Sequence, residues 1–126
     1  MDVPEDLRYT NEHVWARSEG DLVRVGITDF AQDALGEVVF VELTAADAEV
    51  AAGAPLGEVE STKSVSEIEA PVAGVVVELN TALTADPGPV NADPYGDGWM
   101  ALLRPLDERA FSRLLDAAAY RELTES

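Results

Sequence analysis

Lys63 is the only lysine in the chain, and the other seven basic residues are arginines. Lysine is ordinarily among the commonest residues, so its retention at a single position suggests chemistry at its amine. Strand-like segments flank Ser61-Thr62-Lys63-Ser64, which predicts a hairpin with the amine at its tip. A solvated lysine amine is protonated at neutral pH and is a poor nucleophile. We therefore expect a separate enzyme to acylate Lys63; a codon bias toward arginine is the alternative explanation of the scarcity.

Few other residues are candidates for chemistry. His13 is the one histidine, so a catalytic triad or a zinc site would depend on it alone, and a structural or surface role is the simpler interpretation. Glu60 and Glu67 flank the lysine as a candidate acid and base, although carboxylates on a solvated hairpin explain them equally simply. The sequence contains no glycine-rich phosphate loop and no calcium-loop spacing. We therefore predict no independent active site.

The neighbours of Lys63 suit modification by a partner enzyme. Ser61, Thr62, Ser64 and Ser66 have small polar side chains, which would let another protein's active site close over the amine. Two hydrogen-bonded strands would hold the tip in a fixed position.

Composition sets further limits. The 126 residues suffice for one domain, which we expect to span 1–126, with a core over about 7–103 and a helical tail over about 107–123. The net charge of −17 repels phosphate backbones and anionic lipid, so we expect no nucleic-acid or membrane partner and favour basic protein surfaces. The absence of cysteine excludes disulfides and thiol chemistry.

The acidic N-terminus lacks the basic-then-apolar pattern of a secretory leader. The chain is therefore predicted to be cytoplasmic.

The hydrophobic pattern predicts a mostly β chain. A short helix is expected over 28–36, with Asp29 as N-cap and Gly36 as its stop. Residues 44–54 read as a loop with one strand-like turn, and residues 86–98 as turns. The tripeptide Val-Glu-Leu recurs 36 residues apart, which hints at a duplicated β unit. Strands are expected over 14–17, 22–27, 37–43, 56–61, 64–70, 75–80 and 99–103, and one or two amphipathic helices over 107–123.

The segment Glu58-Val59-Glu60-Ser61-Thr62-Lys63-Ser64-Val65-Ser66-Glu67, followed by Ala70-Pro71-Val72-Ala73-Gly74, resembles the lipoyl-attachment segment of the glycine cleavage system H-protein family. Further blocks resemble the family in the same order across residues 7–123. These blocks are Tyr9-Thr10, His13, Trp15, Val25 to Gln32, Leu35 to Leu43, Val90-Asn91, Asp93 to Gly96 and Gly98-Trp99.

The resemblance implies a barrel-sandwich hybrid of two related sheets, as in lipoyl and biotinyl carrier domains, with a short inner helix and a C-terminal helical extension. It implies a carrier rather than an enzyme, with lipoic acid amide-linked to Lys63. The arm receives the aminomethyl group of glycine from a pyridoxal-phosphate decarboxylase and presents it to a tetrahydrofolate-dependent aminomethyltransferase. Dihydrolipoamide dehydrogenase then reoxidises the arm. A lipoate ligase or a lipoyl or octanoyl transferase would load Lys63, and we expect a monomer.

The same resemblance implies roles for residues around the lysine. The cofactor-binding segment would comprise Glu60, Ser61, Thr62, Ser64, Val65 and Glu67, with the two acids recognised by the lipoylating enzyme or orienting the amine of the loaded arm. Glu12 and His13 would lie at a cleft for the arm. The family commonly has an acid where this chain has Val14, so we expect weaker sheltering of the arm, or sheltering by Glu12 or Glu67.

Other interpretations remain open at this point. A lipoyl relay, or a related carrier for another lipoate-dependent pathway, has the same attachment chemistry. A biotin carrier normally has methionines beside its lysine, whereas Lys63 lies between Thr62 and Ser64. A non-carrier acidic interaction module would leave Lys63 unmodified, and an independent enzyme would require a function for His13.

Overall fold

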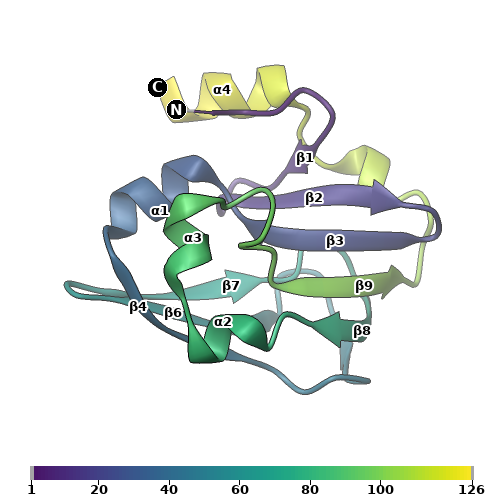
Figure 1. The fold of residues 1–126 in the computed structure, drawn as a ribbon. Helices are drawn as coiled ribbons and strands as arrows, with labels where there is room; N and C mark the ends of the chain where they lie inside the picture. Colours follow the sequence, from purple (N-terminus) through teal and green to yellow (C-terminus); the bar gives the residue numbers. More distant parts are fainter. Residues whose placement is uncertain (1, 126) are drawn as a thin grey trace.

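Two antiparallel β-sheets pack against each other in the computed structural model, which describes residues 2–125 (Figure 1). One sheet has the strand order β1-β2-β3-β9-β8-β5, and the other has the order β4-β6-β7. The strands are β1 Arg8–Tyr9, β2 Val14–Glu19, β3 Leu22–Ile27, β4 Val38–Leu43, β5 Glu49–Val50, β6 Pro55–Ser61, β7 Val65–Glu69, β8 Gly74–Leu79 and β9 Ala101–Pro105. The predicted mostly β architecture is confirmed. The repeated Val-Glu-Leu tripeptide places one copy in each sheet, on β4 and β8.

The helices are short, namely α1 Asp29–Leu35, α2 Ala82–Ala85, α3 Gly88–Ala92, a 3₁₀ turn over Phe111–Arg113 and α4 Ala117–Glu125. The α-helices lie in two places, with α1, α2 and α3 at one end of the sheets and α4 over β1 (Figure 1). The predicted inner helix is confirmed as α1, but its predicted N-cap is wrong. Thr28 is the N-cap, because its extended backbone lets its Oγ1 accept the Ala31 N–H. Asp29 instead lies in the first turn and accepts a hydrogen bond from the Gln32 side chain. Gly36 ends the helix as expected, with φ of 83°.

The main core lies between the sheets. Val14 and Val25 of one sheet and Val41 and Val59 of the other are almost fully buried in one apolar cluster. Removing such side chains from water is the main stabilising contribution to the fold. Leu83 and Val90 complete this cluster from α2 and α3.

A second, smaller cluster joins the two ends of the chain. The predicted C-terminal helical extension is confirmed, but it is shorter than the predicted range 107–123, because only the 3₁₀ turn and α4 are helical. Figure 1 shows the N-terminal segment running beside α4. Tyr120 of α4 stacks on Tyr9 of β1 with ring centroids 4.5 Å apart. Trp15 packs in the same cluster. The tail thus covers the outer face of the six-stranded sheet near the start of β2.

Several predicted elements differ from the structure in kind or in bounds. The sequence predicts only turns over residues 86–98, yet the short helix α3 lies within them. Pro87 is its N-cap and Pro89 stands in its first turn, where the missing backbone N–H is not needed, and Val90 is buried in the core. The final strand starts at Ala101 rather than Trp99. Over the described residues, no helix has the length and apolar character needed to cross a membrane.

Candidate functional site

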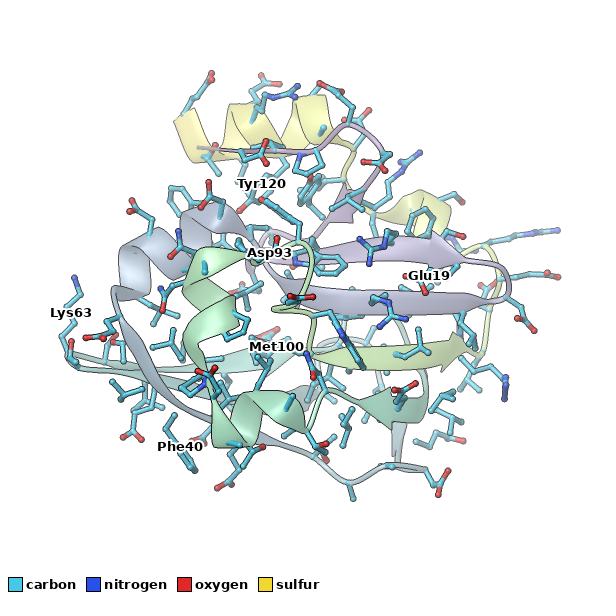
Figure 2. All side chains as sticks on the ribbon, viewed as in Figure 1. Glu19, Phe40, Lys63, Asp93, Met100 and Tyr120 are labelled. Atoms are coloured by element: carbon cyan, nitrogen blue, oxygen red, sulfur yellow. The ribbon has the colours of Figure 1, made fainter. Side chains whose placement is uncertain are left out.

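The predicted lysine hairpin is present, with Lys63 exposed at its tip between β6 and β7. Figure 2 shows the Lys63 side chain projecting from the end of the hairpin, away from the two sheets. The strand register sets Glu60 opposite Val65 and Glu67 opposite Glu58. The predicted acid–base pair of Glu60 and Glu67 is therefore not directly paired across the hairpin.

Ser61 organises the turn that carries the lysine. Its side chain is 6% exposed, and its Oγ accepts the backbone N–H groups of Lys63 at 3.3 Å and Ser64 at 3.1 Å. Its own backbone N–H donates to the Ser64 carbonyl oxygen at 2.8 Å. A serine oxygen that satisfies backbone donors two and three residues later fixes a tight turn. The backbone of Lys63 is thus held while its amine stays in solvent.

The end of α1 supports the hairpin from the side. The Thr62 N–H donates to the Glu37 carbonyl oxygen at 3.2 Å. The Lys63 side chain lies across Gly36, such that a Cβ added there would be 3.2 Å from the lysine Cε. The Asn91 side-chain amide of α3 donates to the Gly36 carbonyl oxygen at 2.9 Å, and its oxygen accepts the Val38 N–H. Helix α3 therefore holds the loop against which Lys63 rests.

A cleft of about 330 Å³ opens beside this tip, between β7, α1 and the start of β2. Its volume falls within the range of small-molecule sites. Ser64 and Leu35 line it, and they are the chain neighbours of Lys63 and Gly36 respectively. The remaining lining is formed by Glu12, His13, Val14, Ile27, Phe30, Ala31, Ala34, Val59, Val65, Ser66, Glu67 and Ile68. The lining is mostly apolar, and a long, flexible substituent on the lysine amine would have this cleft within reach.

The cleft contains two carboxylates and one imidazole. Glu12 and Glu67 are exposed and lie on its lining, from the segment before β2 and from β7. Val14 also reaches the lining but is 1% exposed and belongs to the main core. Negative charge in this cleft therefore comes from Glu12 and Glu67, and an ammonium group is the ligand that such a pair favours.

His13 is fixed from several sides. Its Nδ1 lies 2.8 Å from the Tyr120 hydroxyl, which lies 2.7 Å from Thr28 Oγ1. Its ring also packs on Phe30 with centroids 4.6 Å apart. The predicted structural role of His13 is therefore correct in part, but the residue also lines the cleft. Burial lowers the pKa of His13, while the nearby charge of Glu12 opposes that change more weakly, which favours the neutral imidazole.

The family profile described as "Glycine cleavage H-protein" matches residues 7–126. The chain belongs to this family. The glycine cleavage system H protein of one Thermus thermophilus strain is 53% identical over 126 residues, covering 100% of this chain and 98% of that protein. The same-named protein of Mycobacterium avium is 56% identical over 130 residues, covering 98% of each. The crystal structure of the Mycobacterium marinum H protein has a TM-score of 0.89 and 43% identity, covering 98% of this chain and 100% of that one.

Within this glycine cleavage H-protein fold, the sequence-predicted residues divide into two groups. Glu12, His13, Ser64, Val65 and Glu67 meet at the cleft. Three others shape or flank the lysine turn without lining the cleft, namely Glu60, Ser61 and Thr62.

Four residues that support the H-protein site were not predicted as site residues. Thr28 and Tyr120 hold His13, whereas Gly36 and Asn91 hold the loop beside Lys63. Gly36 was recognisable only as a helix stop. Tyr120 lies 107 residues from His13, so no local pattern connects the two.

Proposed function

We propose that the chain is a lipoyl carrier of the glycine cleavage system and that lipoic acid is attached in amide linkage to Lys63. The observation that carries this proposal is an exposed lysine on a rigid serine-held turn, beside a cleft that a long substituent can enter. A bound lipoyl group supplies a dithiolane that is reduced, carries the aminomethyl group of glycine and is reoxidised. The residues of this chain position that arm and shelter it.

The hairpin supports loading by a partner enzyme. Thr62, Lys63, Ser64 and Ser66 are exposed, and their small neighbours leave the amine accessible. We infer that a lipoate ligase or a lipoyl or octanoyl transferase acylates Lys63. Glu60 is exposed on β6, immediately before the turn. A basic surface of that enzyme would recognise its carboxylate there.

The cleft supports sheltering of the loaded arm. Glu12 and Glu67 would face the ammonium end of the arm, and the apolar side chains of the same lining would exclude water. Since Val14 supplies no charge, the two glutamates share the role that an additional family acid would fill. Because the arm is tethered to the protein, docking of the protein on an enzyme raises the effective concentration of the carried group at that enzyme.

The partners that this function requires are the pyridoxal-phosphate glycine decarboxylase, the tetrahydrofolate-dependent aminomethyltransferase and dihydrolipoamide dehydrogenase. These enzymes supply the catalysis through their own cofactors, so we assign no catalytic residue to this chain. The charge of −17 favours brief docking on basic surfaces. We further propose that the carrier acts as a cytoplasmic monomer. Its relatives carry the glycine cleavage name, so we do not favour a lipoyl-relay role.

Reconstitution tests this function. The protein lipoylated in vitro is expected to support exchange of labelled bicarbonate into glycine when the decarboxylase is added. The Lys63→Arg variant keeps the charge and should support none, because its guanidinium cannot be lipoylated. Exchange by unlipoylated protein, or no exchange by protein with a verified lipoyl group, would contradict the proposal.

A further inference from the structure

Thr28, Tyr120 and His13 form a chain of two hydrogen bonds, and the donor in each bond can be assigned because each hydroxyl has one proton to donate. Thr28 Oγ1 is fully buried and already accepts the Ala31 N–H at 3.1 Å. Its hydroxyl proton must donate to a partner, and among the described residues the Tyr120 oxygen is its acceptor. Tyr120 then donates its own proton to His13 Nδ1, 2.8 Å away. His13 Nδ1 is therefore an acceptor, and its proton resides on Nε2.

The backbone of His13 shows that this arrangement is imposed by its surroundings. Its φ of 67° lies in the left-handed region, which non-glycine residues adopt at a cost unless neighbouring contacts enforce it. The Thr28 N–H donates to the His13 carbonyl oxygen at 3.1 Å, and the His13 N–H donates to the Thr10 carbonyl oxygen. The same residue, Thr28, therefore holds both the backbone and, through Tyr120, the ring of His13.

The groups that face the cleft around His13 come from four parts of the fold. The segment before β2 contributes Glu12, whose charge acts on His13, and β7 contributes Glu67 to the same lining. Helix α1 presents the uncharged ring of Phe30, and α4 presents the Tyr120 hydroxyl. A neutral His13 leaves the two carboxylates uncompensated, whereas a protonated His13 would add a competing cation to the same cleft.

We propose that Thr28 and Tyr120 hold His13 as the neutral Nε2–H tautomer, and that protonation of His13 expels a cationic arm end from the cleft. The arm in this statement rests on the proposed function, but the proton relay does not. Tyr120 and Thr28 are positioning residues that act through His13. The C-terminal helix thereby becomes part of the carrier site rather than only a cover for the sheet.

The relay can be tested on the unmodified protein by nitrogen NMR of the imidazole, since the chain has one histidine. The wild-type protein is expected to show protonated Nε2 and acceptor Nδ1. Tyr120→Phe keeps the ring that stacks on Tyr9 but removes the donor. We expect a mixture of tautomers and a roughly fivefold higher protonation constant for His13 in this variant, as for the loss of one ordinary hydrogen bond.

Tyr9→Phe is the matched control. It removes a hydroxyl that donates to the Pro4 carbonyl oxygen and takes no part in the relay. It should leave the His13 tautomer and protonation constant unchanged. A wild-type ring protonated on Nδ1, or equal His13 signals in Tyr120→Phe and wild type, would overturn the relay.

The effect on the arm is measured as the lifetime of aminomethyl-loaded protein against pH. We expect the lifetime to fall roughly fivefold as the pH drops through the His13 titration. His13→Asn should abolish this step, because asparagine tolerates the left-handed backbone but does not titrate. A step that persists in His13→Asn would overturn the switch alone. Failure of Lys63 to accept lipoate would refute the proposed function and the arm's role, leaving the NMR result on the relay intact.

Discussion

The Oγ of Ser61 lies 3.3 Å from the backbone nitrogen of Lys63 and 3.1 Å from that of Ser64, and it is the acceptor for both. A single buried hydroxyl thus sets the backbone of the attachment residue. These hydrogen bonds hold the backbone of the turn, while the Lys63 side chain remains exposed to solvent.

Ser61→Ala is expected to loosen this turn. Two backbone N–H groups lose their acceptor, which should lower the free energy of unfolding by about 1 kcal/mol and slow enzymatic lipoylation of Lys63 several-fold. Urea unfolding and a timed mass-spectrometric assay of lipoylation measure the two effects. Ser66→Ala on the exposed part of the same hairpin is the control and should change neither. Unaltered lipoylation of Ser61→Ala would show that the turn is held by its backbone alone.

Gly36→Ala tests the support beside the lysine. Gly36 has φ of 83° and ψ of −157°, a region that is essentially restricted to glycine, so alanine there should cost about 1–3 kcal/mol of stability. Its Cβ would also press on the Lys63 side chain, and we expect slower lipoylation. Gly53→Ala is the matched control, since φ is 84° there but no atom lies within 4 Å of the added Cβ. Equal lipoylation of both variants, despite similar losses of stability, would contradict a specific role for Gly36.

Glu12→Gln and Glu67→Gln test the charges of the cleft. Each removes one carboxylate from the lining, and we expect the lifetime of the aminomethyl-loaded arm to shorten roughly fivefold. Val14→Glu should lengthen it, at a cost in stability because Val14 is buried in the core. Glu58→Gln neutralises an exposed acid opposite Glu67 that does not line this cleft. If Glu58→Gln has the same effect as the cleft variants, overall charge rather than the cleft controls the lifetime.

The alkaline limit of stability should depend on the tyrosines. Burial raises the pKa of Tyr95 to about 12 and also raises the pKa values of Tyr9 and Tyr120. These are the chain's three tyrosines. An unfolded tyrosine ionises with a pKa of about 10, so their contribution to stability is complete below that pH and is lost as the pH rises above it. Ultraviolet titration should show phenolate appearing together with unfolding. Ionisation of all three in a folded protein would contradict the assigned burial.

Much of this fold could be predicted because its determinants are local. The alternation of β6 and β7, the glycine that ends α1 and the lysine at the turn are all visible within short stretches of sequence. Helix α3 could not be predicted, because its prolines and glycine favour a turn while the burial of Val90 is a tertiary effect. The N-cap assignment failed for a similar reason, since Thr28 and Asp29 are both good caps and only the fold selects Thr28.

The lysine site was likewise more predictable than its surroundings. Lys63 and its serines are contiguous, whereas the cleft unites segments from three parts of the chain. The link between Tyr120 and His13 spans 107 residues and leaves no periodic signal. Long-range hydrogen bonds of this kind become visible only once the sheets are assembled.

The most direct test of the central claim is the intact mass of the protein purified from its native host, with peptide mapping of the segment that contains Lys63. We predict a lipoyl increment on Lys63 and on no other residue. Unmodified Lys63 that a lipoate ligase also fails to acylate in vitro would contradict the carrier function.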